Sequence, residues 1–310
     1  MSVANTAAAS GKGPVLAAEP GRWQQPVFHA LIDARSRFGA RRAALVDGDE
    51  RVLTYEEIIR ASLALGHALK KGTRSGESVG ILLPTGAGAV IAFFAVSAYG
   101  RVPAMLNFTS GAAGLKSALN TAKVKRIVTA KRFIQLGKLE ALIGQLEKTY
   151  EIVYLEDVRE KLSLLDKVFA AVGSVVPSLV ASHAMYSTPA VILFTSGTEG
   201  EPKGVALSHA NLLSNVEQVR EHLTLYETDI LFNPLPTFHC FGLTVGSLMP
   251  LLLGIKVVCH PTPLQPHEIV KRIRETGSTI LLSTDTFISQ YARAGESGRP
   301  QLAAARGVRR

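Results

Sequence analysis

The sequence has few of the residues that stabilise disulfide-rich or zinc-binding proteins. It contains two cysteines, Cys240 and Cys259, among 310 residues. Two cysteines are too few for a disulfide framework, so a reducing compartment, the cytoplasm, is expected. A histidine adjoins each cysteine (His239 and His260). The C-x-x-C and H-x-x-x-H spacings of zinc sites are missing, and we assign no metal ligands.

Long uninterrupted apolar runs are also missing. The most apolar stretch, residues 240–255, contains Pro250, and it is shorter than the ~20 residues that a membrane-spanning helix requires. Residues 1–22 are rich in Ala, Gly and Ser and lack the apolar segment of a signal peptide, so we expect a mobile tail there. These features predict a soluble cytoplasmic protein and leave peripheral membrane contact open.

Acidic residues are absent between Ser78 and Leu139. The basic residues of this interval are Arg101, Lys116, Lys123, Lys125, Arg126, Lys131, Arg132 and Lys138. The whole chain has a formal net charge of +9 and a pI near 9.6, which favours acidic partners. An ordinary solvated face and a docking surface for an acidic carrier protein or for lipid headgroups both fit this distribution.

From Trp23 onward the sequence alternates between strand and helix patterns. The run from Val79 to Leu83 is apolar and Pro84 closes it, as expected for a buried parallel strand. Further strand patterns occupy residues 127–129, 152–154, 191–194, 230–232, 257–258 and 280–282. Helical patterns separate most of them, which predicts a layered α/β fold with largely parallel sheets flanked by helices. We expect one domain over residues 23–298, with a subdomain boundary near the less regular segment 162–187.

Two local signals predict individual contacts near the start of this domain. Residues 45–46 and 52–53 are apolar and flank the turn-forming run Asp47-Gly48-Asp49, which predicts a β-hairpin. Thr54 is followed three residues later by Glu57, the pattern of a capping box that begins a helix.

The stretch that says most about function reads Thr-Ser-Gly-Thr-Glu-Gly-Glu-Pro-Lys-Gly-Val, from Thr195 to Val205. It directly follows the strand pattern at 191–194, and α/β proteins bind ligands at the carboxyl ends of strands. Its glycines allow positive φ and close approach of the backbone, while hydroxyls and backbone N–H groups can bind phosphate oxygens. Lys203 adds a positive charge, so the loop is predicted to hold a polyphosphate.

Two other phosphate-binding patterns are excluded. A Walker loop needs Gly before its Lys and Ser or Thr after it, whereas Pro202 and Gly204 flank Lys203. The dinucleotide fingerprint requires a third glycine and an acidic residue about twenty positions later. The run that begins at Gly86 has Ile91 at the third glycine position and no acidic residue at that distance.

The stretch from Thr195 to Val205 resembles the phosphate loop of the adenylate-forming superfamily, which includes acyl-CoA synthetases, luciferases and peptide-synthetase adenylation domains. Glu199 stands where most members have Thr, a departure that resembles the long-chain acyl-acyl-carrier-protein synthetase branch. The run Pro-Leu-Pro-Thr-Phe-His-Cys-Phe-Gly, with His239 in it, is similar to the second core motif of the superfamily. The resemblance covers residues 23–297, and it implies that the domain expected over residues 23–298 is an incomplete N-terminal domain of the adenylate-forming fold.

The resemblance implies a two-step reaction that uses ATP and Mg²⁺. A fatty acid carboxylate attacks the α-phosphate, giving acyl-adenylate and pyrophosphate, and the thiol of CoA or of an acyl carrier protein then accepts the acyl group. No nucleic acid partner is implied. The residues implied to hold the nucleotide phosphates are Thr195, Ser196, Gly197, Thr198, Glu199, Gly200, Lys203 and Gly204. His239 is implied as the catalytic residue, and Phe238 and Phe241 either line the acyl substrate or belong to the core.

Members of the superfamily continue with Tyr-Gly-x-Thr-Glu and Thr-Gly-Asp motifs and a mobile C-terminal domain, and none of these matches the present sequence. Residues 299–310 contain four arginines, and we expect an irregular basic tail there, with a frameshift, a premature stop or a gene fragment as its hypothesised origin. Three functions therefore stay open. They are a ligase impaired by truncation, a nucleotide-binding remnant without catalysis, and a basic module that binds carrier protein or membrane.

Overall fold

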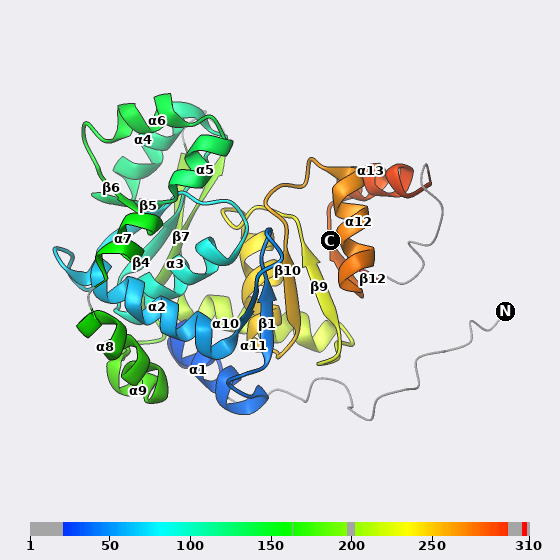
Figure 1. Cartoon of the computed structure of the whole chain (residues 1–310), viewed down its shortest axis with the longest axis horizontal. Helices are drawn as coiled ribbons and strands as arrows, with labels where there is room; N and C mark the ends of the chain where they lie inside the picture. Colours follow the sequence, from blue (N-terminus) through cyan, green and yellow to red (C-terminus); the bar gives the residue numbers. More distant parts are fainter. Residues whose placement is uncertain (1–20, 163, 197–201, 297–305, 309–310) are drawn as a thin grey trace.

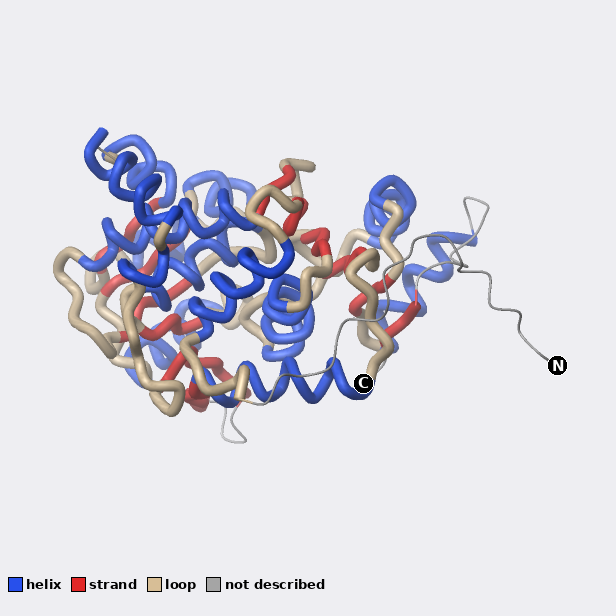
Figure 2. Tube along the Cα trace, turned by 90° about the horizontal axis from the view of Figure 1, so that it is seen from below, coloured by secondary structure: helices blue, strands red, loops and turns tan. Residues whose placement is uncertain are grey.

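Two sheets, each flanked by helices, form the protein (Figure 1). The computed structural model describes residues 21–162, 164–196, 202–296 and 306–308. Viewed from below, the strands lie between layers of helices (Figure 2). The predicted layered α/β fold with largely parallel sheets is confirmed.

The first sheet lies on the left in Figure 1 and uses residues 78–208. Its strands are β3 (Ser78–Ile81), β4 (Val102–Met105), β5 (Arg126–Thr129), β6 (Glu151–Tyr154), β7 (Pro189–Ser196) and β8 (Pro202–Ser208). They are ordered β6-β5-β3-β4-β7-β8, and β8 runs antiparallel to β7. The helices of this region are α3 (Ala87–Ala98), α4 (Gly111–Thr121), α5 (Lys131–Leu136), α6 (Glu140–Leu146), α7 (Leu155–Lys161), α8 (Leu164–Val175) and α9 (Pro177–Val180).

The second sheet combines the two ends of the described chain. Its strands are β1 (Ala43–Val46), β2 (Val52–Thr54), β9 (Ile230–Asn233), β10 (Lys256–Cys259), β11 (Ile280–Leu282) and β12 (Arg306–Val308), in the order β12-β11-β9-β10-β1-β2. The helices that follow β9 are the π-helix η1 (Phe241–Leu248), α11 (Met249–Leu252), α12 (Pro266–Thr276) and α13 (Asp285–Glu296). The strand β1 pairs in parallel with β10, so residues about 210 positions apart in the sequence share one core.

The chain crosses between the sheets through α2 (Tyr55–Lys70) and α10 (His209–His222). Helix α1 (Val27–Phe38) contacts both α3 and α11, so it lies between the two sheets. The boundary expected near residues 162–187 does not coincide with a change of sheet. That segment runs between β6 and β7 of the same sheet, and α8 packs against α2, with its buried Gly173 next to the Leu63 side chain.

Both local signals at the start of the domain are present in the structure. The β1 and β2 strands form an antiparallel hairpin in which Val46 lies opposite Val52. At the start of α2, the Thr54 hydroxyl accepts a hydrogen bond from the Glu57 N–H at 3.3 Å, and the Glu57 carboxylate accepts one from the Thr54 N–H at 2.8 Å. The Thr54 N–H and the Thr54 hydroxyl both donate hydrogen bonds to the Glu57 carboxylate, and these two bonds lower the pKa of the Glu57 carboxyl, because they favour its charged form.

The C-terminal segment that we expected to be irregular contains a strand. Residues Arg306–Val308 form β12, and Ile280 of β11 pairs with Arg306 in parallel. The sequence Arg-Gly-Val contains only one apolar side chain, so it gave no signal for this strand. Pairing with the edge of β11 needs only backbone groups, which explains how such a sequence can adopt it.

The buried His209 is expected to make the free energy of unfolding depend on pH. The Nδ1 atom of His209 accepts a hydrogen bond from the Val27 N–H at 3.1 Å, and burial, together with the nearby His29, lowers the pKa of His209 to about 4. Between about pH 6.5 and 4 the unfolded chain therefore binds a proton that the folded chain does not. We expect the free energy of unfolding to be unaffected above this window and to fall by about 3 kcal/mol on acidification through it.

Urea unfolding at a series of pH values measures this effect. The variant His209→Asn should show a shallower loss of stability between pH 6.5 and 4 than the wild-type chain, although it starts from a lower stability at neutral pH. The exposed His267 supplies the matched control, and His267→Asn should keep the wild-type pH dependence. An equal acid loss in the His209 variant and the wild type would contradict the assignment.

Candidate active site

The predicted phosphate loop connects the two antiparallel strands β7 and β8. Thr195 lies opposite Lys203 at the loop end of this hairpin, and Ser196 lies opposite Pro202. Directly opposed residues of an antiparallel pair project from the same face. Thr195 and Lys203 are both exposed, so a hydroxyl and an ammonium group are presented together. Gly197, Thr198, Glu199 and Gly200 lie outside the described residues.

Gly204 differs from the prediction. It belongs to β8, opposite Phe194, and its φ angle is not positive. A Cβ atom at this position would lie 3.3 Å from the Thr121 side chain of α4. The hairpin pairing continues to Pro202, so Gly204 is a strand residue that allows close packing rather than a turn residue.

The second predicted motif leaves β9 and enters the π-helix η1, a type of helical turn that is frequent at functional sites. The buried Asn233 holds this connection, because its amide donates to the Gly242 carbonyl at 3.1 Å and its Oδ1 accepts from the Leu235 N–H at 3.1 Å. From the first sheet, the Thr85 hydroxyl donates to the Leu235 carbonyl at 2.7 Å. These bonds position the backbone immediately before His239.

His239 is exposed at the start of η1 and lies against a row of aromatic rings. Its ring centroid is 4.8 Å from that of Phe238, and Phe238 lies 5.1 Å from Phe108. Phe108 lies in turn 5.0 Å from Phe133. Because Phe108 follows β4 and Phe133 belongs to α5, this row connects His239 with the carboxyl edge of the first sheet.

Phe108 also relates His239 to the phosphate loop. Ala104 of β4 pairs with Ile192 of β7. β4 ends at Met105, shortly before Phe108, and the parallel strand β7 ends at Ser196, so Phe108 and the loop after Ser196 both follow the carboxyl ends of parallel strands. The phosphate loop and the His239 segment therefore lie at one edge of the sheet, the edge at which α/β proteins bind ligands.

The two aromatic residues predicted to line the substrate differ in burial. Phe238 is 5% exposed and belongs to the main hydrophobic core, whereas Phe241 is half-buried and packs against that core. Their contacts are those of packing residues, and a role in lining an acyl substrate stays a prediction. The sequence gave no signal for Phe108 or Thr85, because the motif residues that they contact, Phe238 and Leu235, lie at least 130 residues away.

The fold and the site define an α/β protein with a candidate phosphate-binding hairpin at the carboxyl edge of one sheet. The sequence matches the AMP-binding enzyme family over residues 32–309, and the chain belongs to this family. The resemblance to the adenylate-forming superfamily that its motifs indicated is thereby confirmed.

Curated relatives include acyl-CoA ligases and 4-coumarate–CoA ligases. The chain is 27% identical over 289 residues to the acyl-CoA ligase SID4 of Ajellomyces capsulatus, covering 87% of this chain and 48% of the relative. It is 26% identical over 293 residues to the medium-chain fatty-acid–CoA ligase of Escherichia coli K12, covering 93% and 51%. The chain thus spans about half the length of the curated relatives it matches.

Solved structures show the same fold at lower sequence identity. The N-terminal domain of FACL13 from Mycobacterium tuberculosis, bound to an inhibitor, superposes with a TM-score of 0.77 at 18% identity, covering 92% of this chain and 69% of that one. The anthranilate–CoA ligase AuaEII in complex with anthranoyl-AMP superposes with a TM-score of 0.75 at 22% identity, covering 93% and 54%.

Proposed function

We propose that this chain takes part in the ATP-dependent activation of a fatty acid as its acyl-adenylate, for transfer to a thiol. The observation that carries this proposal is the pairing of Thr195 with Lys203 at the sheet edge where the His239 segment also lies. Membership of the AMP-binding enzyme family supports the use of ATP.

The side chains at this edge fit the charge of a triphosphate. Lys203 would neutralise the β- and γ-phosphates, and Thr195 would donate a hydrogen bond to a phosphate oxygen. ATP would supply the adenylyl group that activates the carboxylate, with pyrophosphate as the leaving group, and Mg²⁺ would take most of its ligands from phosphate oxygens and water. His239 would orient the carboxylate beside the α-phosphate, so that catalysis rests on positioning and on charge neutralisation.

A small, mostly apolar cavity lies beside Thr237, in the segment that precedes His239. The Thr237 hydroxyl is buried and lacks a hydrogen-bond partner among the residues that the structure describes. It borders a small cavity whose other walls are mostly apolar, including Phe93, Phe94, Leu243 and Leu248, with Ser247 as a further polar residue. The cavity has a volume of about 10 Å³, which is room for a water molecule and not for an acyl chain.

The thiol acceptor is proposed to be CoA or an acyl carrier protein. The names of the curated relatives refer to CoA, whereas the basic residues between 101 and 138 would complement an acidic carrier protein. No helix among the described residues is both long and apolar enough to span a membrane. The cytoplasmic location and the peripheral membrane contact stay predictions.

Pyrophosphate exchange into ATP tests this proposal with the 310-residue chain. Acetate, octanoate, palmitate and benzoate are compared as carboxylates, and exchange is expected to depend on a fatty acid. If the exchange rate is highest with benzoate, the substrate is an aryl acid and not a fatty acid. ATP binding without exchange for any carboxylate would contradict the proposal and favour nucleotide binding without catalysis.

A further inference from the structure

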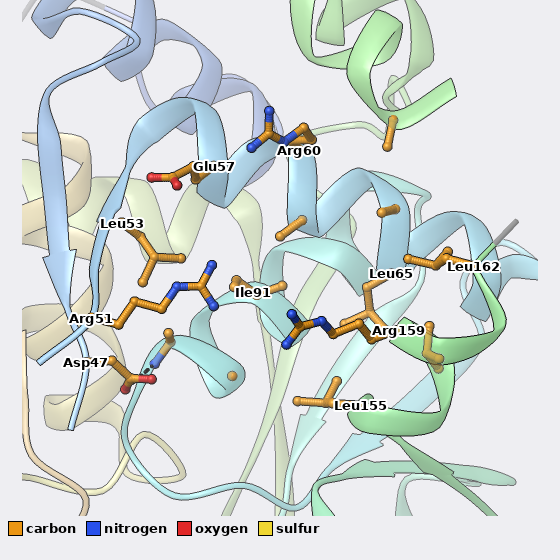
Figure 3. Close-up of a pocket in the computed structure, with 16 residues that line it drawn as sticks. Asp47, Arg51, Leu53, Glu57, Arg60, Leu65, Ile91, Leu155, Arg159 and Leu162 are labelled. Carbon is orange, nitrogen blue, oxygen red and sulfur yellow. Dashed lines mark hydrogen bonds between the residues drawn. The ribbon is translucent and has the colours of Figure 1, made fainter. Parts of the chain in front are cut away.

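A pocket separate from the candidate active site opens between the β1–β2 hairpin, α2, α3 and α7 (Figure 3). Its volume is about 490 Å³, which lies in the range of pockets that hold small molecules. Its walls come from residues 47–65, 87–91 and 155–170, whereas the candidate active site uses residues 195–204 and 233–242. We call this space the arginine pocket.

The floor of the arginine pocket is apolar. Leu53 and Leu65 are buried, and Ile91, Leu155 and Val158 are half-buried and pack against the main core. Binding of an apolar group to this floor is favourable, because the exposed hydrocarbon surface is then removed from water. Water alone is a poor occupant, because the floor offers it few polar partners.

Arginine side chains stand around this floor. Arg51 belongs to the hairpin, Arg60 to α2 and Arg159 to α7, and all three are exposed. Figure 3 shows Arg51 and Arg159 extending toward one another across the pocket. Among the side chains that the structure describes, no carboxylate lies within ion-pair distance of these three guanidinium groups. They are therefore available to an anion.

The acidic residues of the pocket are Asp47 and Glu57, and the pKa of the Glu57 carboxyl is lowered chiefly by hydrogen bonds from Thr54 and to a smaller extent by the charges of Arg51 and Arg60. Asp47 Oδ1 accepts a hydrogen bond from the Ala87 N–H at 3.0 Å, at the start of α3. Glu57 accepts the bonds from Thr54 at 2.8 and 2.9 Å that form the capping box of α2. Both carboxylates are thus held by the backbone and the hydroxyl at helix N-termini, where negative charge is favoured. They do not close the space between Arg51 and Arg159.

We propose that the arginine pocket binds an amphipathic anion, a molecule with one carboxylate or phosphate and an attached hydrocarbon chain. The anion lies between Arg51 and Arg159, and the hydrocarbon covers Leu53, Ile91 and Leu155. Guanidinium groups suit this role because they bind carboxylate and phosphate oxygens in a bidentate manner. Neither a short hydrophilic anion nor an uncharged alkane would use both halves of the pocket.

Calorimetric titration with dodecanoate tests this proposal on the full chain. Dodecanol, which lacks the charge, and acetate, which lacks the chain, are the comparison ligands, and both should bind at least about tenfold more weakly. The double variant Arg51→Ala/Arg159→Ala should lose about tenfold or more in dodecanoate affinity. Arg274, an exposed arginine on α12, supplies the matched control, and Arg274→Ala should bind as the wild type does.

A second variant fills the floor without changing the charge. Ala64 lines the pocket from α2 and is half-buried, so Ala64→Phe should exclude the hydrocarbon and weaken dodecanoate binding while ATP binding is retained. Equal dodecanoate affinity in the wild type, the double arginine variant and Ala64→Phe would overturn the proposal. So would equal affinity for dodecanol.

Two further measurements separate this pocket from the proposed acyl site and identify the source of the ligand. A photoreactive dodecanoate analogue should label peptides from residues 51–65 and 155–162, and Lys203→Ala should not reduce this labelling. Labelling confined to residues 234–248 would overturn the proposal while leaving the proposed function intact. If the wild-type chain sediments with phosphatidylglycerol vesicles and the double arginine variant does not, the ligand is a bilayer lipid. If the wild-type chain binds dodecanoate but does not sediment with the vesicles, the ligand is a free fatty acid.

Discussion

Replacement of Lys203 by alanine is expected to lower ATP affinity and fatty-acid-dependent pyrophosphate exchange by about 10- to 100-fold. The physical reason is the loss of a charge-assisted hydrogen bond from an exposed ammonium group that Thr195 faces across the hairpin. Because exposed Lys203 contributes little to the core, the free energy of unfolding should change by less than about 0.5 kcal/mol. Equilibrium binding of ATP and the exchange assay measure the two functional effects separately.

The control for this variant is another exposed lysine. Lys148 lies between α6 and β6, away from the hairpin, and Lys148→Ala should retain wild-type ATP affinity and exchange. Lys203→Arg should recover part of the lost affinity, since it keeps the charge with a different geometry. If Lys203→Ala binds ATP and exchanges pyrophosphate as the wild type does, the β7–β8 hairpin does not hold the triphosphate.

Substitution of Gly242 by alanine should destabilise the protein by about 3 kcal/mol or more. A Cβ atom at this position would lie 2.2 Å from the Pro236 carbonyl oxygen and 2.9 Å from that of Leu235. Both obstacles are backbone atoms, which cannot move away as a flexible side chain could. Any relaxation must therefore displace the segment that carries His239, so exchange activity should fall together with stability.

Urea unfolding measures this loss, and a glycine in an open helix provides the comparison. Gly144 lies within α6, where the nearest atom to an added Cβ is the Glu147 carboxylate at 3.9 Å. Gly144→Ala should therefore stabilise the protein by about 0.5–1 kcal/mol, because alanine loses less conformational entropy in a helix. A Gly242→Ala variant as stable as the wild type would show that η1 can separate from residues 235–236 at little cost.

The sequence predicted most strands correctly, and its failures have identifiable causes. It missed β4 because Pro103 stands inside it, and proline normally argues against an interior strand. Pro103 is tolerated between β3 and β7, where it is paired in register with Val79. The prediction from sequence also treated the stretch from Thr195 to Val205 as one loop, whereas the pairing of Thr195 with Lys203 places both ends of this stretch in the β7–β8 hairpin.

The residues of the candidate site were partly predictable. Thr195, Lys203 and His239 were identified from their motifs, which are short and local. The contact between Phe108 and Phe238 was not predictable, and neither was the arginine pocket. The pocket combines Arg51 and Arg159, which are more than 100 residues apart, and no sequence pattern marks either one.

The sequence by itself determined the capping box at Thr54, the hairpin that precedes it, the apolar strands and the phosphate-loop motif. Each depends on residues within a few positions of one another, where hydrogen bonds and side-chain periodicity act directly on the backbone. Only the tertiary structure decided that β1 pairs with β10, that Phe238 meets Phe108, and that two arginines face each other over an apolar floor. Those contacts arise when two sheets bury their apolar faces on shared helices, and the burial that drives this packing has no fixed spacing along the chain.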